Sequence, residues 1–304
     1  MAVKPRPSQW IGLEVTAATE AVDAIAEVFR SHGISGVAVE PSVVPADDEG
    51  VQYAGDSARI LAYIPFDDDA GPRQTLLEQA LWHLRAFDLA PISALASRVI
   101  AEEDWANSWK EHFHPLRIGR RFVIKPSWRE FDTQPDDLVI ALDPGMAFGT
   151  GLHPTTRMML EAMEDVIVTG DRVFDVGTGS GILAIAAARL GAAEVLAVDV
   201  DPMACSIASE NVGLNEVDSV VSVSEGSGGS EGSFDVVLAN IIATVIADLA
   251  PTFMGLMKAD SRLIVSGIIE ERARLVSEAF AEAGLDIITT WRDRDWLCQL
   301  VAAG

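Results

Sequence analysis

An α/β fold with a doubly wound sheet is predicted for most of the chain, on three observations. From Asp171 onward, apolar runs of strand length alternate with helical runs, which is typical of a mostly parallel sheet. A glycine-rich segment, Gly177-Thr178-Gly179-Ser180-Gly181, separates the first of these strands from the first of these helices. Asp199 ends the next apolar run. Strand, glycine turn, helix, strand and acid form the layout of a Rossmann-like, nucleoside-binding half.

The first hundred residues predict a separate, smaller α+β domain. Its elements are expected in the order strand, helix, strand, strand, helix, strand, at residues 9–16, 17–31, 34–39, 59–64, 74–86 and 93–101. This order is the split βαβ pattern of ferredoxin-like domains. A charged segment with two tryptophans follows and predicts a linker helix. The predicted boundaries are 1–101 for the ferredoxin-like domain, 102–118 for the linker helix and 119–304 for the Rossmann-like domain.

The Rossmann-like domain is expected to open with two paired strands and a helix, at 122–128, 138–142 and 152–168. Seven strands of the main sheet are then predicted at 171–175, 194–199, 219–223, 234–239, 262–267, 286–291 and 296–302. Four helices are expected between them, at 181–190, 202–213, 242–257 and 271–283. The last two strands predict an antiparallel hairpin at one edge of the sheet. Residues 224–233, rich in Ser and Gly, predict a flexible surface loop.

The net charge of −24 disfavours direct binding to nucleic acid, because phosphate contacts need Lys and Arg. Two interpretations of the acidity remain, solubility and attraction of a basic protein partner. The two cysteines, Cys205 and Cys298, lie in apolar periodic segments and predict buried free thiols in a reducing cytoplasm.

No membrane span, export signal or metal site is expected. The apolar run 236–254 contains Asn240, Asp248 and Pro251, so a buried strand followed by a helix explains it better than a membrane span. The N-terminal residues lead into no hydrophobic signal core. Walker A and HExxH motifs are not found in the sequence.

Asp175 discriminates between the nucleoside cofactors that the glycine turn could hold. A pyrophosphate disfavours a carboxylate beside it, whereas the ammonium of S-adenosylmethionine can be held by one. Gly177 and Gly179 allow close backbone approach, and Asp199 can accept both hydroxyls of a ribose. Asp201, followed by a proline, already fits the cap of the next helix, so Asp199 remains for the ligand.

Asn240 ends the predicted strand 234–239 at its carboxyl tip, where ligands bind in folds of this kind. Amine methyltransferases often have Asn-Pro-Pro-Tyr or a relative at this point. The Asn oxygen can accept a hydrogen bond from an amine and aim its lone pair at a methyl group. Ile241 and Ile242 replace the prolines, so the likeness is partial, and a turn-forming Asn is the alternative interpretation.

The segment from Leu142 to Thr156, LDPGMAFGTGLHPTT, resembles the signature loop of the bacterial ribosomal protein L11 methyltransferase family. Further segments resemble that family: Glu103-Asp104-Trp105, Trp109-Lys110, the segment 113–119, Pro126-Ser127-Trp128, Asn240-Ile241 and Ser266-Gly267-Ile268. Three positions depart from it, with Met146 in place of a frequent leucine, Leu152 in place of a threonine and Thr178 in place of a cysteine. None of these removes a group that methyl transfer needs.

The resemblance implies an S-adenosylmethionine-dependent enzyme that methylates lysine side chains of ribosomal protein L11, and its N-terminal amine as a further target. It implies a cytoplasmic monomer whose N-terminal domain docks the substrate protein. Cofactor-binding positions carry over to Thr156, Gly177, Asp199 and Asn240. The complete set of expected cofactor contacts is Thr155, Thr156, Asp175, Gly177, Gly179, Asp199 and Asn240.

The catalytic residues are left open by the sequence. Asn240 and His153 are the candidates, the first as an acceptor for the substrate amine and the second as a proton acceptor or a purely structural histidine. Thr155 and Thr156 lie at a helix start, suited to the cofactor carboxylate or to ordinary capping. Phe148 could wall the transfer chamber or pack in the core.

Three alternative functions remain at this stage. The first is the same chemistry on a lysine of a different protein, because the motifs do not encode the partner. The second is a nicotinamide-dependent oxidoreductase, against which Asp175 and the short glycine spacing speak. The third is a non-catalytic, ribosome-associated module.

Overall fold

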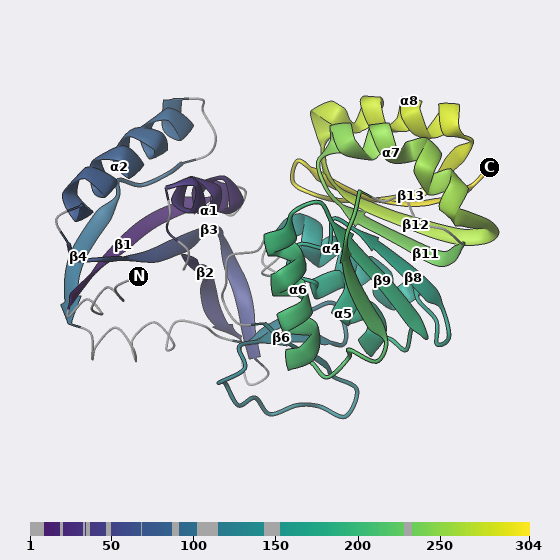
Figure 1. The fold of residues 1–304 in the computed structure, drawn as a ribbon, viewed down its shortest axis with the longest axis horizontal. Coiled ribbons are helices and arrows are strands. Elements are labelled where there is room, and N and C mark those ends of the chain that lie inside the picture. The colour runs from purple at the N-terminus through teal and green to yellow at the C-terminus, as the bar shows by residue number, and fades with distance from the viewer. Residues whose placement is uncertain are drawn as a thin grey trace, which may run out of the picture. The chain divides into compact units, whose positions relative to one another are not determined.

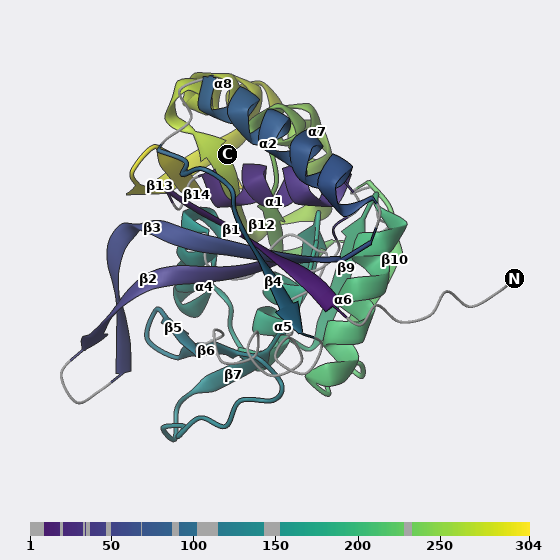
Figure 2. The same ribbon diagram turned by 90° about the vertical axis from the view of Figure 1, so that its left-hand side faces the viewer.

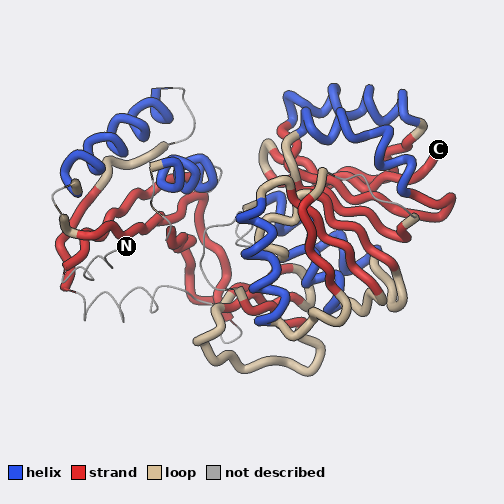
Figure 3. Tube along the Cα trace, in the orientation of Figure 1, coloured by secondary structure: helices blue, strands red, loops and turns tan. Residues whose placement is uncertain are grey.

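The computed structural model describes residues 9–18, 21–32, 34, 37–46, 50–67, 69–86, 91–101, 115–142, 153–227 and 233–304. The chain divides into two compact units, the second of which begins at Pro115 (Figure 1). Helices and strands are distinguished by colour in Figure 3. Among the helices of the described residues, none is long and apolar enough to cross a membrane.

The first unit consists of one sheet and two helices. Its elements are β1 (Gln9–Ala18), α1 (Val22–Ser31), β2 (Val37–Ala46), β3 (Gly50–Pro65), α2 (Ala70–Ala86) and β4 (Ala96–Ala101). The sheet order is β2-β3-β1-β4, with every neighbouring pair antiparallel. Leu13 and Val15 of β1 are buried, as are Phe29 of α1 and Leu81 of α2, so the core lies between the sheet and the helices (Figure 2).

The first predicted helix begins five residues later than expected, at Val22 instead of residue 17. Ala17 and Ala18 instead extend β1, where they pair with Ala58 and Ser57 of β3. The ladder hydrogen bonds to β3 outweigh the helical spacing of the apolar residues at this end.

The second unit contains the predicted seven-stranded, doubly wound sheet, which is confirmed. Its strands are β8 (Arg172–Val176), β9 (Glu194–Asp199), β10 (Val221–Glu225), β11 (Phe234–Asn240), β12 (Met257–Ile269), β13 (Leu285–Asp293) and β14 (Trp296–Ala303). The order is β10-β9-β8-β11-β12-β14-β13. The first five are parallel, and β14 and β13 form the predicted antiparallel hairpin at one edge. The strand order reverses between β8 and β11, which is where ligands bind in such sheets.

Helices cover both faces of this sheet. They are α4 (Pro154–Val166), α5 (Ile182–Arg189), α6 (Pro202–Leu214), α7 (Ala243–Leu256) and α8 (Ala273–Ala283), with a short 3-10 turn, η2 (Glu270–Arg272), before the last. Figure 1 shows α7 and α8 on one face and α4, α5 and α6 on the other. The core beneath α7 and α8 includes Phe174 and Phe234, whose stacked rings lie 4.8 Å apart.

A small third sheet begins the second unit. It contains β5 (Leu116–Ile118), β6 (Phe122–Lys125) and β7 (Leu138–Ala141), with β6 antiparallel to β5 and parallel to β7. The predicted linker helix therefore extended too far, because residues 116–118 are held extended by pairing with β6. The rest of that predicted helix, 102–114, lies outside the described residues.

Two smaller expectations are also corrected. Cys298 is buried, but Cys205 is only half-buried, because it lies in the fourth position of α6 next to the exposed start of that helix. Both thiols are free. The predicted loop 224–233 begins later than expected, because Ser224 and Glu225 continue β10 by pairing with Val198 and Asp199, and its residues 228–232 lie outside the described residues.

Candidate active site at the carboxyl edge of the sheet

The glycine turn between β8 and α5 adopts a backbone that side chains disfavour. Gly177, Gly179 and Gly181 have φ values of +73°, +56° and +83°. The N–H groups of Gly177 and Thr178 both donate to Val198 O, at 2.8 and 3.0 Å, which fixes the turn to the neighbouring strand β9. The turn thereby brings the backbone to the start of α5, where N–H groups and the helix dipole favour negative charge.

Asp175 is fully buried beneath this turn. Thr178 Oγ1 donates to its Oδ2 at 2.7 Å, whereas Oδ1 is buried and has no hydrogen-bond partner among the described residues. Burial raises the pKa of Asp175 to about 7, and the charge of Asp199 acts in the same direction, while the Thr178 hydrogen bond opposes the shift. An unpaired buried carboxylate oxygen is costly, so this atom is suited to a cationic or donor group of a ligand.

Asp199 and Asp201 have different hydrogen-bond partners, and Asp201 is the helix cap that the sequence predicts. Asp199, at the end of β9, accepts hydrogen bonds from Gly179 N (2.9 Å) and Asp201 N (3.0 Å), one on each oxygen. Asp201 caps α6 by accepting from Met203 N at 2.9 Å, with a proline at the first helical position. The Asp199 carboxylate is therefore held at the glycine turn and is not used as the helix cap.

His153 is the N-cap of α4. Its Nδ1 accepts from Thr155 N (3.3 Å) and lies 2.7 Å from Thr155 Oγ1. Its ring also packs edge-to-face on Trp296 of β14, with the centroids 4.8 Å apart. Burial lowers the pKa of His153 to about 4, assisted by the positive charge of Arg157. The histidine is therefore neutral at pH 7 and a weak base, which favours the structural interpretation over the proton acceptor.

Thr155 and Thr156, which the sequence did not separate, differ in the structure. Both are buried at the start of α4. The N–H of Thr155 is used by the His153 cap, whereas Thr156 Oγ1 accepts a hydrogen bond from Asn240 Nδ2 at 3.3 Å. Thr156 thus links the helix start to the tip of β11 and is the better placed of the two for a ligand.

Asn240 ends β11 and is half-buried. Because its Nδ2 donates to Thr156, its Oδ1 is the side-chain atom left to accept a hydrogen bond. The predicted residues Thr155, Thr156, Asp175, Gly177, Gly179, Asp199 and Asn240 lie at the carboxyl ends of β8, β9 and β11, in the glycine turn after β8 and at the start of α4. Of the signature loop, residues 143–152, including Phe148, lie outside the described residues.

Sequence reasoning missed the packing that supports Asn240. A Cβ added to Gly267 would lie 2.2 Å from Ile241 O, and one added to Gly177 would lie 2.3 Å from Ile241 Cγ2. Ile241 is therefore enclosed by two glycines, one in the turn after β8 and one in β12. Gly267 stands within a register shift of β12 between Val265 and Ile268. The sequence offered one signal, the resemblance of Ser266-Gly267-Ile268 to the family. It did not indicate that Ile241 packs against Gly267.

A mixed seven-stranded sheet of this order, with an acid under the glycine turn and an Asn at the tip of β11, is typical of an S-adenosylmethionine-dependent methyltransferase. The sequence model of "Ribosomal protein L11 methyltransferase (PrmA)" matches residues 9–303, and the chain belongs to that family.

Similar proteins share this assignment over almost their whole length. A ribosomal protein L11 methyltransferase of Chloroflexus aurantiacus is 41% identical over 320 residues, covering 95% of this chain and 97% of the relative. One of Herpetosiphon aurantiacus is 42% identical, with the same coverage. Among solved structures, the ribosomal protein L11 methylase of Lactobacillus delbrueckii subsp. bulgaricus is 35% identical, with a TM-score of 0.59 over 62% of this chain and 98% of that one. The methyl donor of the family is S-adenosylmethionine.

Proposed function

We propose that this enzyme methylates lysine side-chain amines of ribosomal protein L11, and its N-terminal amine as a further target. The observation that carries the proposal is Asn240 Oδ1, an available acceptor at the tip of β11 beside the cofactor turn. An amine nucleophile needs such an acceptor to orient its lone pair. The names of the relatives supply L11 as the substrate protein.

We further propose how the site residues hold S-adenosylmethionine. The buried Asp175 Oδ1 would pair with the ammonium group, and the Thr156 N–H at the start of α4 would bind the carboxylate. Thr155 would act through the helix cap. Asp199 would accept the ribose hydroxyls, while the positive φ values of Gly177 and Gly179 shape the turn along which the ligand would lie. An orphaned buried carboxylate oxygen under this turn fits a cationic nucleoside.

Binding of S-adenosylhomocysteine is expected to weaken below about pH 7. The carboxyl of Asp175, with its pKa near 7, must release a proton before it can pair with the ammonium. The Kd should therefore rise about tenfold for each pH unit below 7 and change little above it. Isothermal titration calorimetry from pH 5.5 to 8.5 measures this. Asp175→Asn is the control and should bind weakly with a flat profile; a flat profile for the wild-type protein would contradict the assignment.

The proposed transfer is a direct in-line displacement by a neutral amine. The bound cofactor supplies an electrophilic methyl group with a neutral leaving group. Asn240 Oδ1 would orient the amine, and the desolvated edge of the sheet would favour its neutral form. His153, with a pKa near 4, is too weakly basic to take the proton efficiently. We propose that the lysine ammonium loses its proton to bulk solvent, through water at the half-buried Asn240, before the neutral amine attacks, and that His153 positions Thr155 and Thr156.

The first unit is proposed to be a ferredoxin-like domain, spanning 1–101, that docks L11. The element order and the sheet order β2-β3-β1-β4 support this assignment. The protein's net charge of −24 suits a basic ribosomal protein. A monomer in the cytoplasm, without direct nucleic-acid binding and with a linker that begins at residue 102 and ends before β5, completes the proposal.

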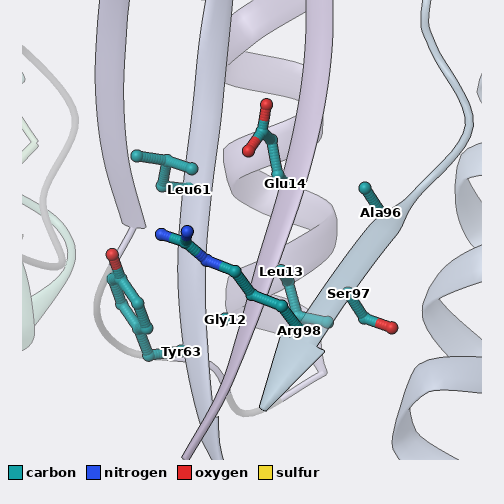
Figure 4. A pocket seen from close by; sticks show the side chains of 8 residues that line it. All are labelled: Gly12, Leu13, Glu14, Leu61, Tyr63, Ala96, Ser97 and Arg98. Atoms are coloured by element: carbon teal, nitrogen blue, oxygen red, sulfur yellow. The ribbon is translucent and has the colours of Figure 1, made fainter. Parts of the chain in front are cut away.

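A shallow pocket lies on the sheet of this unit. It is lined by Gly12 and Glu14 of β1, Tyr63 of β3, Arg98 of β4 and their neighbours (Figure 4). Gly12 pairs directly with Tyr63 on one side and Arg98 on the other, so its missing side chain leaves the depression. Figure 4 shows the Arg98 side chain reaching across β1. In a strongly acidic protein, this exposed cation is suited to an acidic side chain of the docked protein.

Arg98→Ala is expected to raise KM for L11 about tenfold, with kcat and the Kd of S-adenosylhomocysteine unchanged, because one charge-assisted contact is lost. Arg274→Ala is the matched control. Arg274 lies in α8 with its side chain 87% exposed, so its removal changes the net charge equally without touching the pocket. Steady-state kinetics with purified L11 measures both. An equal rise in KM for both variants would contradict a specific role of Arg98.

The function itself is tested with labelled S-adenosylmethionine and purified L11, followed by mass spectrometry of the product. Methyl groups on lysine side chains, or on the N-terminal amine, are expected. Incorporation no greater than into an unrelated basic protein would overturn L11 as the substrate. In that case, comparing methylated proteins between a deletion strain and its parent would identify the lysine that is modified instead.

A further inference from the structure

The turn of the β13–β14 hairpin contacts the start of α4 in two places. Arg157, in the first turn of α4, forms an ion pair with Asp293, the last residue of β13. Trp296, the first residue of β14, packs its ring against His153, the N-cap of the same helix. Residues some 140 positions apart in the chain therefore meet at the helix start that carries Thr156.

The ion pair neutralises a positive charge at a place where a cation alone would be unfavourable. Arg157 lies at the positive end of the α4 dipole, where a cation is disfavoured. Asp293 offsets that charge, and both side chains are only 29% exposed, so solvent screens the pair less than an ordinary surface pair. The two charges also act on the helix cap in opposite directions, since Arg157 lowers the pKa of His153 and Asp293 raises it.

The start of α4 is packed between two parts of the second unit, the tip of β11 and the strand β14. Thr156 Oγ1 accepts from Asn240 Nδ2, so a shift of the first turn of α4 would move Thr156 away from the tip of β11. One turn further along, Met159 is fully buried and its sulfur lies 3.8 Å from Cys298 Sγ of β14. The second turn of α4 is thus fixed by the core, whereas the first is fixed by Arg157, His153 and their partners in the hairpin.

We propose that the Arg157–Asp293 ion pair is a positioning device for cofactor binding, which holds the first turn of α4 so that Thr156 stays beside Asn240. This inference rests on the cofactor roles proposed above. Neither residue is a catalytic residue, because each acts through the helix start. The C-terminal hairpin thereby becomes part of the cofactor site without contributing a contact to the ligand through this pair.

Two single substitutions separate positioning from a simple effect of charge. Arg157→Gln and Asp293→Asn each break the pair, and positioning predicts that each weakens S-adenosylhomocysteine binding about five- to tenfold. The double variant should be no weaker than either single one, because both remove the same interaction. A pure charge effect predicts opposite signs: Asp293→Asn would leave Arg157 unopposed and tighten binding of the ligand carboxylate. Opposite signs, or unchanged Kd values, would overturn the proposal.

The neighbouring pair Arg292–Glu270 is the matched control. It joins the same hairpin to η2 through two short contacts of 2.6 and 2.7 Å, with the side chains 52% and 50% exposed. Glu270→Gln should leave the Kd unchanged; the same loss as in Asp293→Asn would point to general loosening of the hairpin and overturn the proposal.

Isothermal titration calorimetry of the full-length variants at pH 8 measures the Kd of S-adenosylhomocysteine and needs no L11. The melting temperature of each variant is measured alongside. Thr156→Val distinguishes the two ways of failing. If Thr156→Val weakens binding but the ion-pair variants do not, this inference alone is wrong. If Thr156→Val leaves binding unchanged, the hydrogen bond from Asn240 to the Thr156 hydroxyl does not matter for cofactor binding, and the positioning proposal is overturned. The role proposed for the Thr156 N–H would stand, because the variant keeps that group. Failure of L11 methylation in the wild-type protein would bear on the proposed function only.

Discussion

Gly267→Ala is expected to destabilise the second unit by about 3 kcal/mol and to abolish tight cofactor binding. The residue has a φ of +84°, and the added Cβ would lie 2.2 Å from Ile241 O and 2.8 Å from Ile241 C. These are backbone atoms, so the clash cannot be relieved by turning a side chain. The segment that must move continues directly from Asn240. Differential scanning calorimetry should show a melting temperature lower by about 6 to 12 °C for a unit of this size.

Two other glycines separate the causes of this effect. Gly284 has a φ of +77° but nothing within 4 Å of an added Cβ, so Gly284→Ala should cost only the backbone strain, about 1 kcal/mol. Gly255 lies in α7 with neither constraint, so Gly255→Ala should be neutral or stabilising by up to about 1 kcal/mol. A Gly267→Ala variant as stable as Gly284→Ala would show that β12 accommodates the methyl group and that Ile241 is not tightly held.

Asn240→Ala is expected to lower kcat about 100-fold, which corresponds to about 2.7 kcal/mol of transition-state stabilisation. The substitution removes Oδ1, the acceptor proposed to orient the amine, and also the hydrogen bond to Thr156. Because Asp175 and Asp199 would still hold the nucleoside, the Kd of S-adenosylhomocysteine should rise only about threefold. Single-turnover kinetics with saturating L11 measures the chemical step directly.

Asn240→Asp provides the comparison for this variant. It keeps an acceptor oxygen at the same position, and the Thr156 hydroxyl can donate to it in place of accepting. Its activity should therefore fall between the wild-type protein and Asn240→Ala, with a loss of about tenfold. Wild-type turnover by Asn240→Ala, with the fold intact, would remove Asn240 from the catalytic machinery and would leave the cofactor assignment standing.

The parts of the fold that were predicted well are those with strong local patterns. The helix expected at 181–190 is α5 (Ile182–Arg189), because a glycine turn and a closing Gly191 mark its ends in the sequence itself. Prediction failed where pairing with another strand decides the conformation. Ala17 and Ala18 are extended because β3 pairs with them, and the three residues of β5 are extended because β6 does.

The same distinction holds for the site. Asp175, Asp199 and Asp201 were assigned from their order along one βαβ unit, and their hydrogen bonds agree with the separate roles given to Asp199 and Asp201. Other features depend on segments far apart in the chain. Ile241 meets Gly267 of β12, and His153 meets Trp296 of β14. The cap role of His153 was also hard to foresee, because Ser, Thr, Asp and Asn are the preferred N-cap residues.

The two backbone hydrogen bonds on Asp199 have a consequence for the thermodynamics of binding. Both donors are backbone N–H groups of the folded protein, so the carboxylate is preorganised. Immobilising a free side chain on binding typically costs about 0.5 to 1.5 kcal/mol, and most of that cost is already met by folding. Each oxygen also retains a lone pair for a hydroxyl group. Recognition of the ribose should therefore proceed with little loss of side-chain entropy, and the acid should keep the same rotamer with and without the nucleoside.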